Sequence, residues 1–199
     1  QAYFCIGYWV DDVRQSDYFT LDELERVREV FGDQIDYIDS NAYASGEAIT
    51  KEVSVNFNFQ GIDYNYIDVQ PVDMVYGRYL NEGDILGRKK NVVMDVDSAR
   101  LLYGEENVVG RTFRTSLYGY VDEFTVVGVY KKEMSPFQKL MMGGQSDKGS
   151  AFVPYTLLTW PNDYFYYLHV YASEDVDLDA FFQQLKEYVA NYKGREPED

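Results

Sequence analysis

The sequence predicts an α+β fold, because its helix-like and strand-like segments neither alternate strictly nor separate into blocks. The chain of 199 residues contains 20 Tyr and 12 Phe, residue types that favour strands. Two segments near opposite ends have the spacing of amphipathic helices, and glycine-punctuated apolar runs lie between them. These observations predict a medium-sized domain, or two small subdomains.

The first helix is predicted to begin after Thr20, which stands three residues before Glu23 in the spacing of a capping box. Gly32 supplies a stop for this helix. Its apolar stripe is Leu21, Leu24, Val27, Val30 and Phe31. Residues 3–10 predict a preceding strand, which holds the single cysteine, Cys5. We expect Cys5 to be a buried structural thiol.

Two further strands are predicted at residues 35–43 and 49–60, with the turn at Gly46. Apolar and polar residues alternate along the second strand, as they do in a sheet with one solvated face. The apolar set is Val53, Val55, Phe57 and Phe59.

Shorter strands and a short helix are predicted in the middle of the chain. Residues 91–96 read as a buried strand, and Asp97 or Ser98 is expected to cap a short helix that ends at Gly104. Residues 111–117 and 123–130 predict two more strands.

Residues 132–150 predict a long loop, because proline and glycine interrupt them. The loop contains four apolar residues, Phe137, Leu140, Met141 and Met142. They form a candidate partner-contact site, since methionine packs against varied surfaces. Folding back onto the core is the alternative.

The C-terminal part predicts an aromatic strand at residues 164–172 and then a helix capped by Asp177. The helical stripe is Leu178, Phe181, Phe182, Leu185, Tyr188, Val189 and Tyr192. The two long helices can pack on one sheet. We therefore expect residues 1–67 and 163–199 to form one subdomain, with 68–162 as a smaller inserted α/β subdomain.

Charge and hydropathy exclude some partners. The formal net charge of −16 disfavours binding to nucleic acid, whose phosphates carry the same sign. The same charge disfavours docking on anionic lipid through a basic patch. No apolar run reaches the length that spans a bilayer.

Catalytic and metal-binding patterns are weak, so we expect no enzyme activity and no cofactor. His169 stands between Leu168 and Val170 in a predicted strand, which favours a structural role. The sequence Asp95-Val96-Asp97 lacks the remaining ligands and the glycine of a calcium loop. A hydrolase that uses paired carboxylates is a weaker hypothesis, because no pair stands out among 34 acidic residues.

A secreted module that binds carbohydrate or peptide is the alternative function. Exposed aromatic rings stack on sugars and peptides, whereas buried ones pack a sheet. The candidate rings are Trp160, Tyr164, Tyr166 and Tyr167.

Five short signatures occur in a fixed order between Gly77 and Tyr155. They are Gly77-Arg78-Tyr79-Leu80-Asn81-Glu82-Gly83-Asp84, Val92-Val93-Met94-Asp95 with Ala99-Arg100-Leu101-Leu102-Tyr103-Gly104, Val109-Gly110-Arg111-Thr112-Phe113, Phe124-Thr125-Val126-Val127-Gly128-Val129 and Phe152-Val153-Pro154-Tyr155. Their order resembles the extracytoplasmic core domain of MacB-like ABC transporter permeases.

The resemblance implies a domain held on the extracytoplasmic face of the cytoplasmic membrane, between two transmembrane helices of a permease. It implies a porter-like β-α-β subdomain made from both chain ends, and an inserted smaller subdomain. The implied partners are a second permease protomer, a cytoplasmic ATP-binding subunit, and an adaptor or an exported peptide, drug or lipoprotein. The domain would transmit ATPase-driven conformational change, and ATP hydrolysis would occur on the separate subunit or domain.

Overall fold

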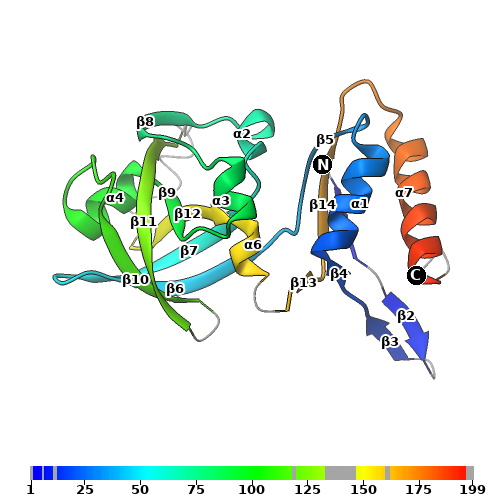
Figure 1. Cartoon of the computed structure of the whole chain (residues 1–199), viewed down its shortest axis with the longest axis horizontal. Coiled ribbons are helices and arrows are strands. Elements are labelled where there is room, and N and C mark those ends of the chain that lie inside the picture. Colours follow the sequence, from blue (N-terminus) through cyan, green and yellow to red (C-terminus); the bar gives the residue numbers. More distant parts are fainter. Residues whose placement is uncertain are drawn as a thin grey trace. The chain divides into compact units, whose positions relative to one another are not determined.

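The computed structural model describes residues 2–5, 7–10, 13–117, 120–132, 147–159 and 162–195. The chain forms two compact units, and the α+β fold class is confirmed (Figure 1). Unit 1 comprises Gln1–Asn41 and Thr159–Asp199, and unit 2 comprises Ala42–Leu158. The sequence predicts the first boundary between the two subdomains after residue 67. The structure places it after Asn41, because the two strands that follow belong to the sheet of unit 2.

In its described residues, unit 1 combines small antiparallel sheets with the helices α1 and α7. Its elements are β1 (Ala2–Phe4), β2 (Gly7–Val10), β3 (Val13–Ser16), β4 (Phe19–Thr20), α1 (Leu21–Phe31), β5 (Ile35–Asp39), β13 (Tyr164–Phe165), β14 (Leu168–Ala172) and α7 (Leu178–Lys193). The main sheet has the order β1-β14-β5, so both chain ends contribute to it. Strands β2 and β3 form a hairpin, and β4 pairs with β13.

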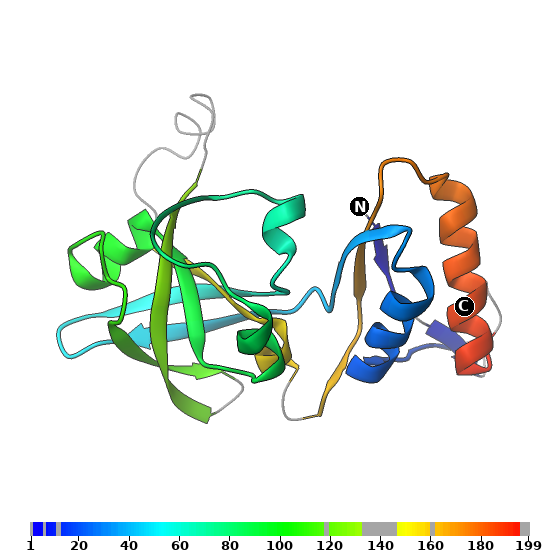
Figure 2. The ribbon, with the colours of Figure 1, turned by 45° about the horizontal axis from the view of Figure 1, so that its top comes forward.

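Helices α1 and α7 lie side by side in both ribbon views (Figures 1 and 2). The ring of Phe31, at the end of α1, meets the rings of Phe181 and Tyr188 edge-on, at centroid distances of 5.8 and 5.5 Å. Tyr192, near the end of α7, lies beside an earlier part of α1, with its ring centre 5.1 Å from the Arg26 guanidinium carbon. The helices are therefore antiparallel.

Unit 2 is built on one large sheet. The elements in its described residues are β6 (Tyr43–Ile49), β7 (Ser54–Ile62), α2 (Tyr66–Val69), β8 (Asp73–Gly77), α3 (Glu82–Leu86), β9 (Asn91–Asp95), α4 (Val96–Tyr103), β10 (Thr112–Leu117), β11 (Tyr120–Lys131), β12 (Gly149–Pro154) and α6 (Tyr155–Leu158). The strand order is β10-β6-β7-β12-β9-β11-β8. Because β10 also pairs with β11, the sheet closes into a barrel, and β8 is attached outside the closed ring.

Four phenylalanines fill the barrel and account for the alternation predicted in β7. Phe57, Phe59, Phe113 and Phe124 are all buried, and their neighbouring ring centroids lie 5.7 to 6.3 Å apart. Aromatic pairs at such separations add to the stabilisation from buried apolar area. The inward face of β7 is therefore fixed by the rings it must bury.

Some predicted turns and caps lie elsewhere. Gly46 stands inside β6, where a Cβ atom would lie 2.8 Å from the Thr115 hydroxyl, so it permits close strand packing. The turn lies at residues 50–53, closed by a hydrogen bond from the Thr50 N–H to the Val53 carbonyl. Asp95, rather than Asp97 or Ser98, caps α4 by accepting from the Ser98 N–H at 2.9 Å.

Two predicted strands are interrupted, and the expected environment of Cys5 is wrong. The strand expected at residues 164–172 divides into β13 and β14, and the one at 3–10 divides into β1 and β2. Cys5 lies in the break between β1 and β2 and is exposed.

A buried carboxylate organises the signature that runs from Gly77 to Asp84. The Asp84 side chain is fully buried and accepts from two Arg78 guanidinium nitrogens, at 2.6 and 3.2 Å. It also accepts from the backbone N–H of Asn81 at 3.1 Å and from the Asn91 amide at 2.9 Å. The Asn81 side chain in turn accepts from the Asp84 N–H, which completes a capping box for α3.

These hydrogen bonds decide the ionisation of Asp84. Burial alone would raise the pKa of its carboxyl group, but the bonds from Arg78, Asn81 and Asn91 outweigh burial and hold the pKa below its usual value. A carboxylate whose pKa is lowered by folding adds stability above its unfolded-state pKa. That contribution is lost as the pH falls through the folded-state pKa.

Two glycines hold Arg78 in place. Gly77 has φ of +69°, a conformation that glycine adopts without strain. The following N–H, of Arg78, donates to the Val127 carbonyl at 2.9 Å. A Cβ atom on Gly128 would lie 2.1 Å from the Arg78 carbonyl oxygen, so only glycine allows β8 to approach β11 this closely.

We predict that Arg78→Met lowers the free energy of unfolding by about 3 kcal/mol at neutral pH, because it leaves Asp84 buried without its main partner. The deficit should shrink as the pH falls below about 4, where the native protein also loses its lowered-pKa contribution. Denaturant titrations at several pH values measure this. Arg100→Met is the control, since the ion pairs of Arg100 with Asp97 and Glu106 are exposed. A deficit that is independent of pH would contradict the role given to Asp84.

Candidate functional site

A network of charged groups in unit 1 joins the start of α1 to the end of α7. The Lys193 ammonium lies 2.7 Å from Glu23 Oε1 and donates to the Tyr18 carbonyl at 2.7 Å. The two side chains are only 13% and 11% exposed, respectively. Since water screens this pair poorly, it is stronger than an ordinary surface ion pair.

Glu23 also begins α1. Its Oε2 accepts from the Thr20 N–H at 2.8 Å, and the Thr20 hydroxyl accepts from the Glu23 N–H at 3.3 Å. The capping box predicted from the sequence is therefore confirmed. One carboxylate thus satisfies an N–H at the start of α1 and holds a cation from the end of α7.

The last turn of α7 is shaped to complete the contact. Gly194 has φ of +64° and ends the helix in the left-handed conformation, and the Arg195 N–H donates back to the Ala190 carbonyl at 2.8 Å. This reversal brings the Arg195 guanidinium to 3.4 Å from Asp17 Oδ2. We call the group Asp17, Tyr18, Glu23, Lys193 and Arg195 the helix-end network.

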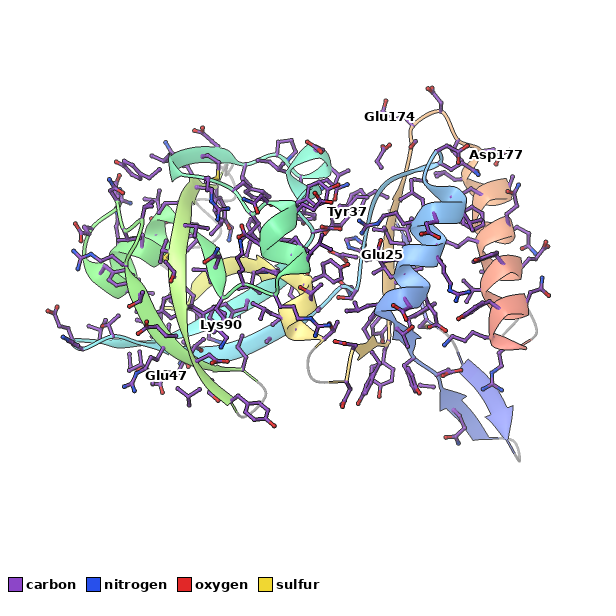
Figure 3. All side chains as sticks on the ribbon, in the orientation of Figure 1. Glu25, Tyr37, Glu47, Lys90, Glu174 and Asp177 are labelled. Atoms are coloured by element: carbon purple, nitrogen blue, oxygen red, sulfur yellow. The ribbon has the colours of Figure 1, made fainter. Side chains whose placement is uncertain are left out.

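The beginning of α7 is fixed separately. The Asp177 side chain accepts from the N–H groups of Asp179 and Ala180, as the sequence predicted for a cap, and it stands at the first turn of the helix (Figure 3). Phe181 and Leu185 are buried, but Leu178 and Tyr192, at the two ends of the predicted stripe, are exposed. Helix α7 is therefore anchored at its start, middle and end.

The aromatic residues singled out from the sequence are largely exposed. Tyr164, Tyr166 and Tyr167 are between 37% and 50% exposed, and Trp160 lies outside the described residues. Tyr18 joins this row, with its ring centre 5.0 Å from that of Tyr164. The Lys193 ammonium lies 5.5 Å from the centre of the Tyr18 ring, so the row borders the helix-end network.

The predicted partner-contact residues Phe137, Leu140, Met141 and Met142 lie outside the described residues. The residues on either side of residues 133–146 are described. The Lys132 ammonium donates to the Ser150 hydroxyl at 3.1 Å, and that hydroxyl donates to the Asp95 carboxylate. This network ties the end of β11 to the start of β12.

His169 has the structural surroundings that its sequence context favours. It is buried on β14 opposite Asp39 on β5, and its Nδ1 lies 3.1 Å from Asp39 Oδ1. The Tyr37 hydroxyl donates to the other oxygen of the same carboxylate. The three side chains link β5 to β14 in the core of unit 1.

In the part of the chain that the structure describes, no group of three or more His, Cys, Asp or Glu side chains is arranged to hold a metal ion. Among the helices of these same ranges, none has the length and apolar character needed to cross a bilayer.

A family model for the MacB-like periplasmic core domain matches residues 4–188. The macrolide export ATP-binding/permease protein MacB of Agrobacterium fabrum is 28% identical over 124 residues. That match covers 60% of this chain but only 18% of the relative, so the chain corresponds to a small part of that protein.

Two solved structures share the fold. The periplasmic region of MacB from Actinobacillus actinomycetemcomitans aligns with a TM-score of 0.68 and 21% identity, over 90% of this chain and 76% of that one. The extracellular domain of the noncanonic ABC-type transporter YknZ from Gram-positive bacteria aligns with a TM-score of 0.69 and 20% identity, over 90% and 87%.

We predict that Lys193→Met destabilises unit 1 by about 2 kcal/mol, because Glu23 and the Tyr18 carbonyl lose a charged donor. Hydrogen exchange should quicken at the backbone amides of residues 18–23 and 190–195. Lys186→Met is the matched control, since Lys186 is an exposed lysine of the same helix. Unchanged exchange rates at residues 18–23 in Lys193→Met would show that the network does not hold α1.

Proposed function

Because the chain belongs to the MacB-like periplasmic core domain family, we propose that it transmits ATPase-driven movement of an ABC transporter permease to a substrate or partner outside the cytoplasmic membrane. It serves in this proposal as the extracytoplasmic domain of the permease subunit. ATP hydrolysis takes place on a cytoplasmic subunit or domain, and a second permease protomer completes a dimer. The transported molecule is an exported peptide, drug or lipoprotein.

The observation that carries the proposal is the nearly buried contact between Glu23 and Lys193. In a permease of this kind, the segments before α1 and after α7 lead toward the membrane. A displacement that enters through one segment passes directly to the other where the two helix ends are joined. The ion pair, the Lys193–Tyr18 hydrogen bond and the edge-on rings of Phe31 and Phe181 supply that connection.

The rest of unit 1 supports transmission by a stiff body. Strand β14 lies between β1 and β5, so the main sheet joins the N-terminal and C-terminal parts of the chain. The buried contacts among His169, Asp39 and Tyr37 cross the β5–β14 pair. A packed core of this kind passes on displacement because it resists compression.

The proposal is tested in the full-length permease, reconstituted with its ATPase. A spin label at Gln184→Cys, an exposed position of α7, reports the distance between the two protomers once Cys5 is replaced by serine. We predict that this distance differs between the nucleotide-free and ATP-bound states, and that Lys193→Met reduces the difference. The Lys186→Met control should retain it.

Two results would count against the proposal. If the inter-protomer distance is the same in both nucleotide states, the domain does not follow the ATPase. If Lys193→Met shows the same change as the parent protein, movement does not pass through the helix-end network.

A further inference from the structure

We propose that unit 2 carries a binding site for the C-terminal carboxylate of a peptide, in a cleft between the β6–β7 turn, the end of α4 and the start of β10. The cleft has a volume of about 620 Å³, a size typical of ligand sites. The residues of its lining on which the proposal rests are Lys51, Glu52, Tyr103, Arg111, Arg114 and Glu123. This proposal does not depend on the proposed transmission of movement.

The backbone around the cleft is fixed by hydrogen bonds. Lys51 lies in the turn after β6, where the Thr50 hydroxyl accepts from the N–H groups of Glu52 and Val53. Arg114 stands in β10, opposite Ile49 of β6 and Glu123 of β11. The Arg111 N–H donates to the Val108 carbonyl, and the Arg111 carbonyl accepts from the Val126 N–H. The charged side chains therefore start from an ordered frame, which lowers the entropy lost on binding.

The charges around the cleft favour an anionic group at its centre. Of the three cations, Arg111 is ion-paired with Glu105. Lys51 and Arg114 have no ion pair or hydrogen bond with any other residue that the structure describes. In a chain whose net charge is −16, three cations at one cleft are a local concentration of positive charge, although Glu123 stands opposite Arg114 in the β10–β11 pair. A carboxylate is an anion that a guanidinium can bind with two parallel hydrogen bonds.

The acidic residues favour a peptide over an isolated anion. Glu52 and Glu123 line the same cleft as the cations. Carboxylates accept hydrogen bonds from backbone N–H groups, so a peptide can place its terminal carboxylate on Arg114 and its amides toward Glu123. A free inorganic anion would be attracted by the cations but repelled by Glu52 and Glu123, so it would bind more weakly than a peptide.

Tyr103 forms part of the wall of the cleft beside Arg111. Its ring centre lies 6.0 Å from the Arg111 guanidinium carbon, and its buried hydroxyl has no hydrogen-bond partner in the described structure. Burial raises the pKa of Tyr103 to about 12 although Arg111 acts in the opposite direction, so the hydroxyl stays protonated. Because this hydroxyl is closed off from solvent, Tyr103 contributes its ring to the wall beside Arg111 and not a donor to the ligand.

The test uses acetyl-trialanine with a free C-terminal carboxylate and, as the matched ligand control, its C-terminal amide. Each is titrated into the ¹⁵N-labelled 199-residue chain and followed by amide chemical shifts. We expect saturable shifts at residues 49–53 and 110–114 with the free carboxylate and none with the amide. Binding should weaken as the salt concentration rises, because the cations are exposed.

Protein variants distinguish binding of the peptide at this cleft from nonspecific electrostatic attraction of the peptide to the protein surface. Arg114→Gln should weaken binding about tenfold, the usual scale for loss of a charged hydrogen-bond donor. Lys51→Gln, in a surface turn, provides a second test should Arg114→Gln disturb β10. Arg100→Gln, on the exposed face of α4, should bind like the parent chain. Equal binding of the amide, shifts confined to other residues, or no saturable shift at millimolar peptide would overturn the proposal.

Discussion

In each unit, one nearly buried carboxylate at the third position of a helix caps that helix and also holds a cation from another segment. Glu23 caps α1 and binds Lys193 from the end of α7, and Asp84 caps α3 and binds Arg78 from the end of β8. Separating the segments would leave a charge in a poorly hydrated place, which is far more costly than losing a surface ion pair. The helix start and the distant segment are therefore held together in both units.

The remaining packing extends these two contacts. In unit 1, the rings of Phe31, Phe181 and Tyr188 join the other end of the α1–α7 pair. In unit 2, β8 lies close to β11 because neither Gly77 nor Gly128 carries a side chain, and the closed barrel is filled by phenylalanine rings. The two carboxylates thus hold the ends of helices and strands in place, and apolar packing holds the helices and strands themselves together.

Local features were predictable from the sequence, whereas contacts between distant segments were not. The capping box of Thr20 and Glu23 and the alternation in β7 depend on residues a few positions apart, and both are present. The ion pair between Glu23 and Lys193 could not be predicted from the sequence, because it depends on the antiparallel packing of α1 and α7. Gly46 resembles a turn residue in sequence, yet it serves close contact with Thr115. The cleft residues Lys51, Arg111 and Arg114 are joined only by barrel closure, so no sequence pattern marks them.

The ion pair at the helix ends is best tested by a double-mutant cycle in denaturant unfolding. The chains are the parent, Glu23→Gln, Lys193→Met and the double variant. Glutamine retains the capping acceptor and removes the charge, so the cycle isolates the contact between α1 and α7. A coupling energy of about 1–2 kcal/mol between the two positions is the predicted result, within the range for residues in direct contact. Additive effects of the two substitutions would contradict the account.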